Sequence, residues 1–105
     1  GILGSVAFKG LVRGKVVIVT SVQDLDHIKQ GDILITHMTT TNFVPYLSKV
    51  SAIVTDEGGI TCHAAIISSE MCIPCVIGTR YATKAFRDGE LVEDDANKGI
   101  VRRIT

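Results

Sequence analysis

The chain has 105 residues, of which 46% are apolar and 21% charged, and its formal net charge is zero. This length and composition predict a single domain over residues 1–105 with a modest hydrophobic core. Because there is no run of lysines and arginines, and no apolar stretch near the roughly 18 residues that span a bilayer, we expect neither nucleic acid nor a membrane as a partner.

The apolar pattern along the chain predicts many short strands and few helices. Strands are expected over residues 5–10, 13–20, 33–35, 52–55, 76–78, 91–93 and 100–104. Short helical turns are expected over residues 23–30 and 82–86, and in a segment whose first turn holds Pro45, with Thr41 or Asn42 as its N-cap. The longest predicted helix covers residues 62–71. This order favours a mixed α/β domain with a strand-rich core and helices on one side.

The stretch from Asp56 to Ile67 combines a glycine turn with a helix start. A buried strand enters it, Gly58 and Gly59 free the backbone for a tight turn, and Thr61 is expected to cap the helix that follows. Unpaired N–H groups and the positive end of the helix dipole then meet in one place, which favours binding of an anion such as phosphate. His63 lies in the first turn of this helix, within reach of the same place.

Residues 58–66, Gly-Gly-Ile-Thr-Cys-His-Ala-Ala-Ile, resemble the phosphohistidine signature of a known family. That family is the mobile, swivelling domain of phosphoenolpyruvate-utilising enzymes, which include phosphoenolpyruvate synthase and pyruvate, phosphate dikinase. Residues 31–36, 40–41, 73–79 and 88–92 also fall in the order and spacing of that family, so the resemblance covers nearly the whole chain. It implies a three-layer β/β/α swivelling fold.

The resemblance implies that His63 carries a phosphoryl group. The chemistry agrees, because a neutral imidazole keeps a lone pair that can attack phosphorus, and phosphoryl transfer depends mainly on positioning and charge stabilisation. We expect Gly58, Gly59, Thr61 and Cys62 to surround the phosphoryl group. The alternative is that His63 is a structural residue at the start of a helix, with the two glycines forming an ordinary turn.

Thr61 is also a regulatory candidate. In the dikinase and synthase branches of the family, the matching threonine is modified by a regulatory kinase/phosphorylase. A phosphate on Thr61 would place negative charge beside the helix start and repel a phosphoryl group approaching His63. The alternative role of Thr61 is that of a plain N-cap.

The implied partners are an ATP-grasp nucleotide-binding domain and a (β/α)8 barrel that binds phosphoenolpyruvate or pyruvate. The chain has no phosphate-binding loop of the Gly-Lys-Ser/Thr type, so ATP and Mg²⁺ are expected in the partner domains and no cofactor in this one. The chain is then a fragment of a larger phosphotransferase and has no turnover alone. A different possibility is a free-standing phosphohistidine or binding module with another acceptor.

The cysteines offer a rival interpretation. Cys72 and Cys75 have the spacing of a metal knuckle or a redox dithiol, and Cys62 or His63 would complete a zinc site. A helix between Cys62 and Cys72 would, however, hold them about 15 Å apart at ~1.5 Å per residue. We therefore expect buried, inert thiols and no metal. An odd number of cysteines argues against a secreted disulfide scaffold and favours the cytoplasm.

We predict structural roles for the remaining polar residues. His27 and His37 are expected at the surface or in satisfied structural positions, and Asp94 and Asp95 in a solvated turn over residues 94–99. The Thr39–Thr40–Thr41 run is expected to cap the next helix rather than to bind phosphate. Members of the family often carry an arginine near the position of Ser69, which this chain lacks. The difference affects the assignment of subfamily and partner more than the role expected of His63.

Overall fold

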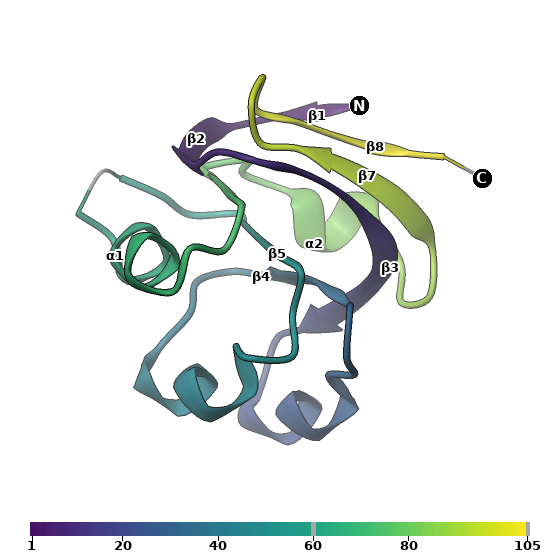
Figure 1. Cartoon of the computed structure of the whole chain (residues 1–105). Coiled ribbons are helices and arrows are strands. Elements are labelled where there is room, and N and C mark those ends of the chain that lie inside the picture. The colour runs from purple at the N-terminus through teal and green to yellow at the C-terminus, as the bar shows by residue number, and fades with distance from the viewer. Residues whose placement is uncertain (60, 105) are drawn as a thin grey trace.

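The computed structural model describes residues 1–59 and 61–104. These residues form eight strands and four short helices, and each helix lies between two consecutive strands in the part of the chain from β3 to β7 (Figure 1). The strands are β1 (Ile2–Leu3), β2 (Ser5–Phe8), β3 (Leu11–Val19), β4 (Ile33–Thr36), β5 (Ala52–Thr55), β6 (Cys75–Ile77), β7 (Leu91–Asp95) and β8 (Ile100–Arg103). The α-helices are α1 (His63–Met71) and α2 (Ala82–Ala85), and the 3-10 helices are η1 (Val22–His27) and η2 (Thr41–Tyr46). The predicted mixed α/β class is confirmed.

All eight strands join one sheet in the order β1-β8-β7-β3-β4-β5-β6-β2. The nine-residue strand β3 belongs to two layers, because residues 11–15 pair antiparallel with β7 and residues 16–19 pair parallel with β4. Strands β3, β4, β5 and β6 are parallel neighbours, so their carboxyl ends meet at one edge. The sheet thus bends at the middle of β3 into an antiparallel layer and a mainly parallel layer.

Gly4 lets the two ends of this sheet approach each other. Strands β1 and β2 lie at opposite ends of the strand order but are consecutive in the chain, with Gly4 between them. The Gly4 N–H donates to the carbonyl oxygen of Gly99 at 2.9 Å. A Cβ on Gly4 would come within 2.6 Å of the Ile77 carbonyl oxygen, so no other residue fits without displacing the backbone. The sheet therefore curls into a nearly closed barrel.

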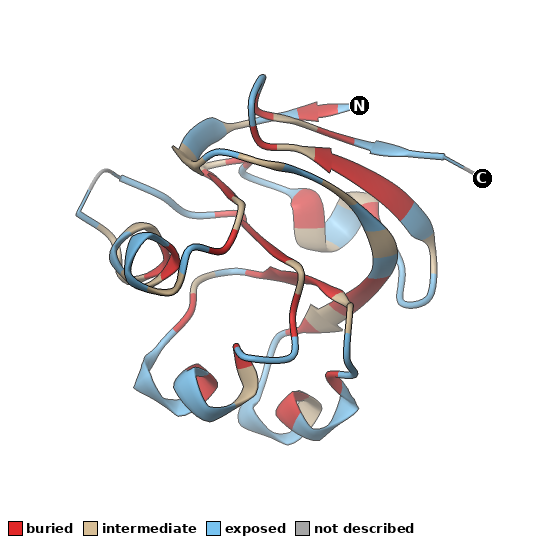
Figure 2. Ribbon diagram, in the orientation of Figure 1, coloured by how far each residue is buried: buried red, intermediate tan, exposed pale blue. Residues whose placement is uncertain are grey.

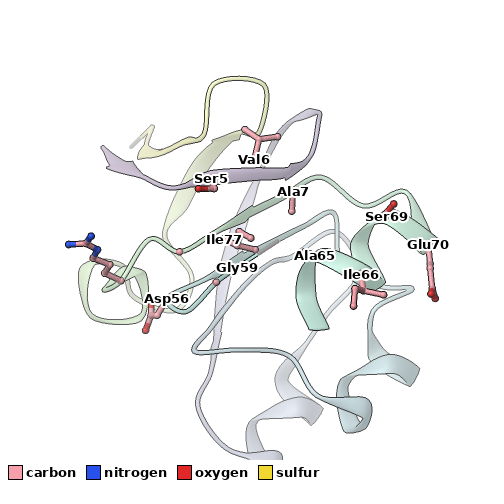
Figure 3. A pocket seen from close by; sticks show the side chains of 13 residues that line it. Ser5, Val6, Ala7, Asp56, Gly59, Ala65, Ile66, Ser69, Glu70 and Ile77 are labelled. Atoms are coloured by element: carbon pink, nitrogen blue, oxygen red, sulfur yellow. The ribbon is translucent and has the colours of Figure 1, made fainter. Parts of the chain in front are cut away.

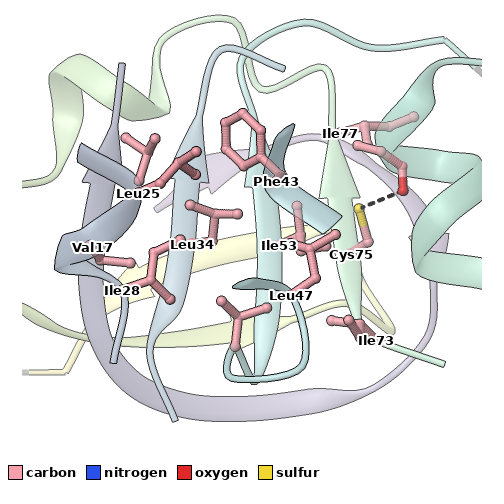
Figure 4. Close-up of a cluster of buried hydrophobic side chains, with 13 residues drawn as sticks. Val17, Leu25, Ile28, Leu34, Phe43, Leu47, Ile53, Ile73, Cys75 and Ile77 are labelled. Carbon is pink, nitrogen blue, oxygen red and sulfur yellow. Dashed lines mark hydrogen bonds between the residues drawn. The ribbon is translucent and has the colours of Figure 1, made fainter. Parts of the chain in front are cut away.

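Two hydrophobic cores lie on the two faces of the parallel layer. Strand β5 shows the division, since Ala52 and Val54 face the space between the two strand layers while Ile53 faces α1, η1 and η2. Every residue of β4 and β5 is buried (Figure 2), as expected for strands that are covered on both sides. The helix-side core is drawn in Figure 4. The three layers are those of the predicted β/β/α swivelling fold.

Strand β7 extends further than predicted and places a carboxyl group in the barrel interior. Glu93 points outward, where it accepts hydrogen bonds from Arg13 at 2.9 Å and from Arg102 at 2.7 Å. Asp94 therefore points inward, is 0% exposed, and has no hydrogen-bond partner for either oxygen among the described residues. Burial, with a smaller contribution from Asp95, raises the pKa of Asp94 to about 8. The prediction of a solvated turn was wrong for Asp94 because strand alternation overrode its polarity.

The η2 segment also differs from the prediction. It is a 3-10 helix whose N-cap is Thr40 rather than Thr41 or Asn42, and the Thr40 side chain makes no capping hydrogen bond. Pro45 lies inside the helix instead of in its first turn. The predicted boundaries of the other elements hold to within a few residues; the strands at 52–55 and near 33–35 match closely, and the short strand β1 was not predicted.

The buried carboxyl group of Asp94 should make stability depend on pH. Its folded-state pKa of about 8 lies above the value of about 3.9 for an unfolded chain, so the folded state binds more protons between these limits. The free energy of unfolding is therefore expected to fall as pH rises from about 4 to about 8 and to level off above. Urea denaturation across this range should show a flatter profile for Asp94→Asn.

Asp95→Asn is the matched control, because its side chain lies at the adjacent position on the other face of β7 and is partly solvated. It should keep most of the native slope. Equal slopes for the native protein and Asp94→Asn would contradict a protonated Asp94 in the fold.

Candidate functional site

The loop after β5 is fixed to the ends of two neighbouring strands. The Glu57 N–H donates to the His37 carbonyl oxygen, and the Gly78 N–H donates to the Glu57 carbonyl oxygen, each at 3.0 Å. Gly58 lies against the backbone of Gly78, where a Cβ would come within 2.6 Å of the Gly78 nitrogen. By contrast, apart from its chain neighbours, no atom of the described residues lies within 4 Å of the position that a Cβ on Gly59 would occupy. Packing thus requires glycine at position 58, whereas position 59 faces open space.

Helix α1 begins at His63, one residue later than predicted. Its N-cap is Cys62, in an extended conformation and without a side-chain capping hydrogen bond, so the expectation that Thr61 is the N-cap was wrong. Thr61 is exposed, Cys62 and His63 are half-buried, and Ile60 lies outside the described residues. The N-cap side chain leaves the first-turn N–H groups unbonded, so as far as the described residues show they can bind an anion at this helix start.

The ring of His63 is held by a threonine from another strand end. His63 Nδ1 lies 2.7 Å from Thr39 Oγ1, and Thr39 is 1% exposed. The sequence suggested that Thr39 caps a helix; the structure instead uses its hydroxyl group to orient the histidine. The link has a topological cause, because Thr39 follows β4 and His63 follows β5, and the carboxyl ends of these parallel strands share one edge.

The other two histidines have different surroundings. His37 Nδ1 lies 2.8 Å from Asp56 Oδ2, and the buried Asp56 carboxylate also accepts hydrogen bonds from the N–H and hydroxyl groups of Thr83. This pair joins the end of β4 to the start of α2. His27 is largely exposed and lies 3.9 Å from a carboxylate oxygen of Asp24. Of the three histidines, His63 is the one at the start of an α-helix beside the glycine loop.

A groove of about 1010 Å³ runs beside this loop (Figure 3). Its walls are β2, the outward face of α1 and the turn after β6, and its floor includes Gly58, Gly59 and Gly78. Ile66 and Ser69 line it from the helix. The groove therefore runs from the glycine loop along residues 65–70 of α1, and His63 lies beside it rather than among its lining residues.

The three cysteines differ in environment. Cys75 is buried, and burial raises the pKa of its thiol to about 12, which disfavours the thiolate that redox chemistry requires. Cys72 is exposed at the end of α1 in a left-handed conformation, so the expectation of a buried thiol was wrong there. In the described part of the chain, no three His, Cys, Asp or Glu side chains are grouped where they could share a metal ion. This geometry supports neither a zinc nor a dithiol site.

The described helices are also too short or too polar to cross a bilayer; the longest, α1, has nine residues.

Comparison with known sequences points to one family. Residues 28–99 match the family model described as "PEP-utilising enzyme, mobile domain". The chain is 50% identical over 95 residues to a probable phosphoenolpyruvate synthase of Methanothermobacter thermautotrophicus, covering 90% of this chain and 14% of that protein. It is 47% identical over 95 residues to the phosphoenolpyruvate synthase of Pyrococcus furiosus, covering 90% of this chain and 12% of that protein. The chain thus spans a small part of the curated relatives it matches.

Solved structures of other proteins share the fold of this chain. A solution structure of an Enzyme I protein aligns with a TM-score of 0.64 at 29% identity, over 76% of this chain and 33% of that one. Aconitase X of Thermococcus kodakaraensis aligns with a TM-score of 0.75 at 17% identity, over 99% of this chain and 98% of that one. The second likeness concerns the fold alone.

The cysteine environments predict distinct rates of thiol labelling. In a Cys62→Ser variant, Cys72 should react rapidly with a disulfide reagent such as Ellman's reagent, because its side chain is exposed. Cys75 should react only as the protein unfolds, since it is buried and its thiol is protonated. Peptide mapping of the labelled protein identifies the site. Rapid labelling of both thiols in the folded variant would contradict this assignment.

Proposed function

Because the chain belongs to the family of mobile domains of phosphoenolpyruvate-utilising enzymes, we propose that it is a phosphoryl carrier and that His63 is the residue that carries the group. The single observation that supports this most directly is the 2.7 Å contact between His63 Nδ1 and Thr39 Oγ1. It fixes the ring at a helix start where the N-cap side chain makes no hydrogen bond and where Gly59 faces open space among the described residues.

The contact with Thr39 assigns the reactive nitrogen in this proposal. When Nδ1–H donates to Thr39 Oγ1, the lone pair of the neutral imidazole is on Nε2. Nε2 attacks the phosphorus atom of the donor, a nitrogen–phosphorus bond forms, and the bond from phosphorus to the leaving group breaks with its electron pair going to that group. Delivery to an acceptor is the same substitution with Nε2 as the leaving group.

The residues around His63 then have separate tasks. Gly59 leaves room for the phosphoryl group, because no described atom lies where its Cβ would be. The N–H groups of the first turn of α1, at the positive end of its dipole, stabilise the negative charge, whereas the Cys62 N–H donates to the Gly59 carbonyl oxygen at 3.0 Å and holds the loop. Gly58 keeps the loop against Gly78 and so holds this arrangement in place. Thr61 is exposed, so a regulatory kinase/phosphorylase could reach it, and a phosphate there would repel the group on His63.

The donor and acceptor sites belong to other domains in this proposal. We infer an ATP-grasp domain as donor site and a phosphoenolpyruvate- or pyruvate-binding (β/α)8 barrel as acceptor site, in a cytoplasmic enzyme. The names of the curated relatives and the small share of their length that this chain covers support that inference. Mg²⁺ is assigned to those partner sites, since the described residues offer no cluster of metal ligands to hold it. A free-standing carrier with another acceptor is the alternative.

Phosphorylation of His63 can be tested by intact-mass measurement after treatment with phosphoramidate or with the parent enzyme's ATP-binding domain and ATP. The native domain should gain one acid-labile phosphoryl group that maps to His63. His63→Ala should gain none, whereas His27→Ala and His37→Ala should match the native protein. A folded domain that takes no group from a competent donor, or takes it equally on all three histidines, would refute the carrier function.

The role of Thr39 predicts an effect on both rate and regiochemistry. Thr39→Val keeps the size of this buried side chain but removes the hydroxyl group, and phosphorylation should slow by about tenfold or more, the worth of one hydrogen bond of ~1.5 kcal/mol. Thr39→Ser should retain most of the native rate. NMR should show phosphate on Nε2 in the native protein, and an Nδ1 adduct there would contradict the assigned tautomer.

A further inference from the structure

Arg80 occupies an unusual position beside the glycine loop. It follows β6 in the turn that begins at Gly78, and it lines the groove together with Gly58, Gly59 and Ser69. It is exposed, and it is the one lysine or arginine among the described residues that line the groove. No ion pair with another described residue holds its guanidinium group. The charge is therefore available to a ligand.

The backbone of Arg80 is in a conformation that favours glycine. Its φ is +77°, in the left-handed region that side chains with a Cβ rarely adopt. The surrounding structure imposes it: the Arg80 N–H donates to the Asp56 carbonyl oxygen at 2.8 Å, and the Thr79 N–H donates to the Thr55 carbonyl oxygen at 3.0 Å. If only the path of the turn mattered, glycine would serve better at position 80. The strain indicates that the side chain itself is needed.

The charges around the groove indicate that this side chain has a role in binding an anion. Among the described lining residues, the loop contributes Asp56 and the helix wall contributes Glu70, so Arg80 is the one positive charge that faces an incoming anion. A phosphoryl group arriving at the loop carries negative charge that the helix dipole compensates only in part. A planar guanidinium with several N–H donors matches two phosphoryl oxygens at once, and its charge persists at every physiological pH.

We propose that Arg80 binds the phosphoryl group as it passes between the donor and His63. This inference rests on the carrier function proposed above and adds a binding residue to it. Arg80 takes no part in bond making: the nitrogen–phosphorus bond at His63 forms as the bond to the leaving group breaks, and the guanidinium pairs with the phosphoryl oxygens throughout. The Asp56 carbonyl oxygen, which accepts from the Arg80 N–H, and the neighbouring Thr79, whose hydroxyl donates to the Thr55 carbonyl oxygen, hold the turn that carries Arg80.

The decisive variant is Arg80→Gly, which removes the side chain and also relieves the backbone strain. Its thermal stability should equal or exceed that of the native protein, because glycine adopts φ near +77° without penalty. The rate of His63 phosphorylation by phosphoramidate should nevertheless fall by about tenfold, as expected for loss of one charge-assisted contact. Arg80→Lys should recover part of the rate, since it restores charge without the bidentate geometry.

Arg87→Gln is the matched control, because Arg87 is an exposed arginine that does not line the groove. It should leave the rate unchanged. A stable Arg80→Gly variant that is phosphorylated at the native rate would overturn the inference and leave the carrier function intact.

Failure of the native protein to become phosphorylated would instead count against the carrier function. In that case, the role of Arg80 in anion binding is tested by titrating the protein with inorganic phosphate. The dissociation constant is measured from the NMR amide signals of Gly58 and Gly59. The dissociation constant should rise severalfold in Arg80→Gly but not in Arg87→Gln. Equal dissociation constants in the native protein and Arg80→Gly would overturn the role of Arg80 as an anion-binding residue.

Discussion

The parallel pairing of β3, β4, β5 and β6 is the constraint on which the rest of the molecule depends. These strands are covered on both faces, so their apolar side chains divide between two cores that stabilise the structure from opposite sides. Parallel pairing also brings the carboxyl ends of all four strands to one edge. The residues that follow β4, β5 and β6 have to share the space at that edge, which is why Thr39, His63 and Arg80 come from separate segments of one region.

At that edge, backbone hydrogen bonds rather than side chains fix the position of the loop. Glu57 bonds to the residues after β4 and β6, and Gly58 lies directly on the backbone of Gly78. Such contacts are insensitive to side-chain rotamers, so the loop presents the same surface whatever the neighbouring side chains do. The side chains that carry chemistry are then free to remain exposed or half-buried, as a site that must meet a partner requires.

Charge is distributed differently over the two strand layers. The outer face of the antiparallel layer places Glu93 between Arg13 and Arg102, and the hydrogen bonds from these arginines lower the pKa of Glu93. The interior of the barrel holds Asp94 without a partner among the described residues, at a cost to stability near neutral pH. Strand β7 contributes no residue to the proposed site, and Asp94 serves no step in it.

Local sequence patterns were sufficient to predict the elements with the strongest local signals. The apolar runs at β4 and β5 predicted buried strands, the glycine pair before an amphipathic run predicted the turn into α1, and the resemblance around His63 identified the family. For Asp94 and Thr39 the local signals are weaker, and they predict a solvated turn and a helix cap, respectively. Their roles follow from long-range pairing, because strand register turns Asp94 inward and parallel pairing brings Thr39 to His63 from 24 residues away. A residue's identity fixes which bonds it can form, but the partner it meets depends on which distant segments the sheet places beside it.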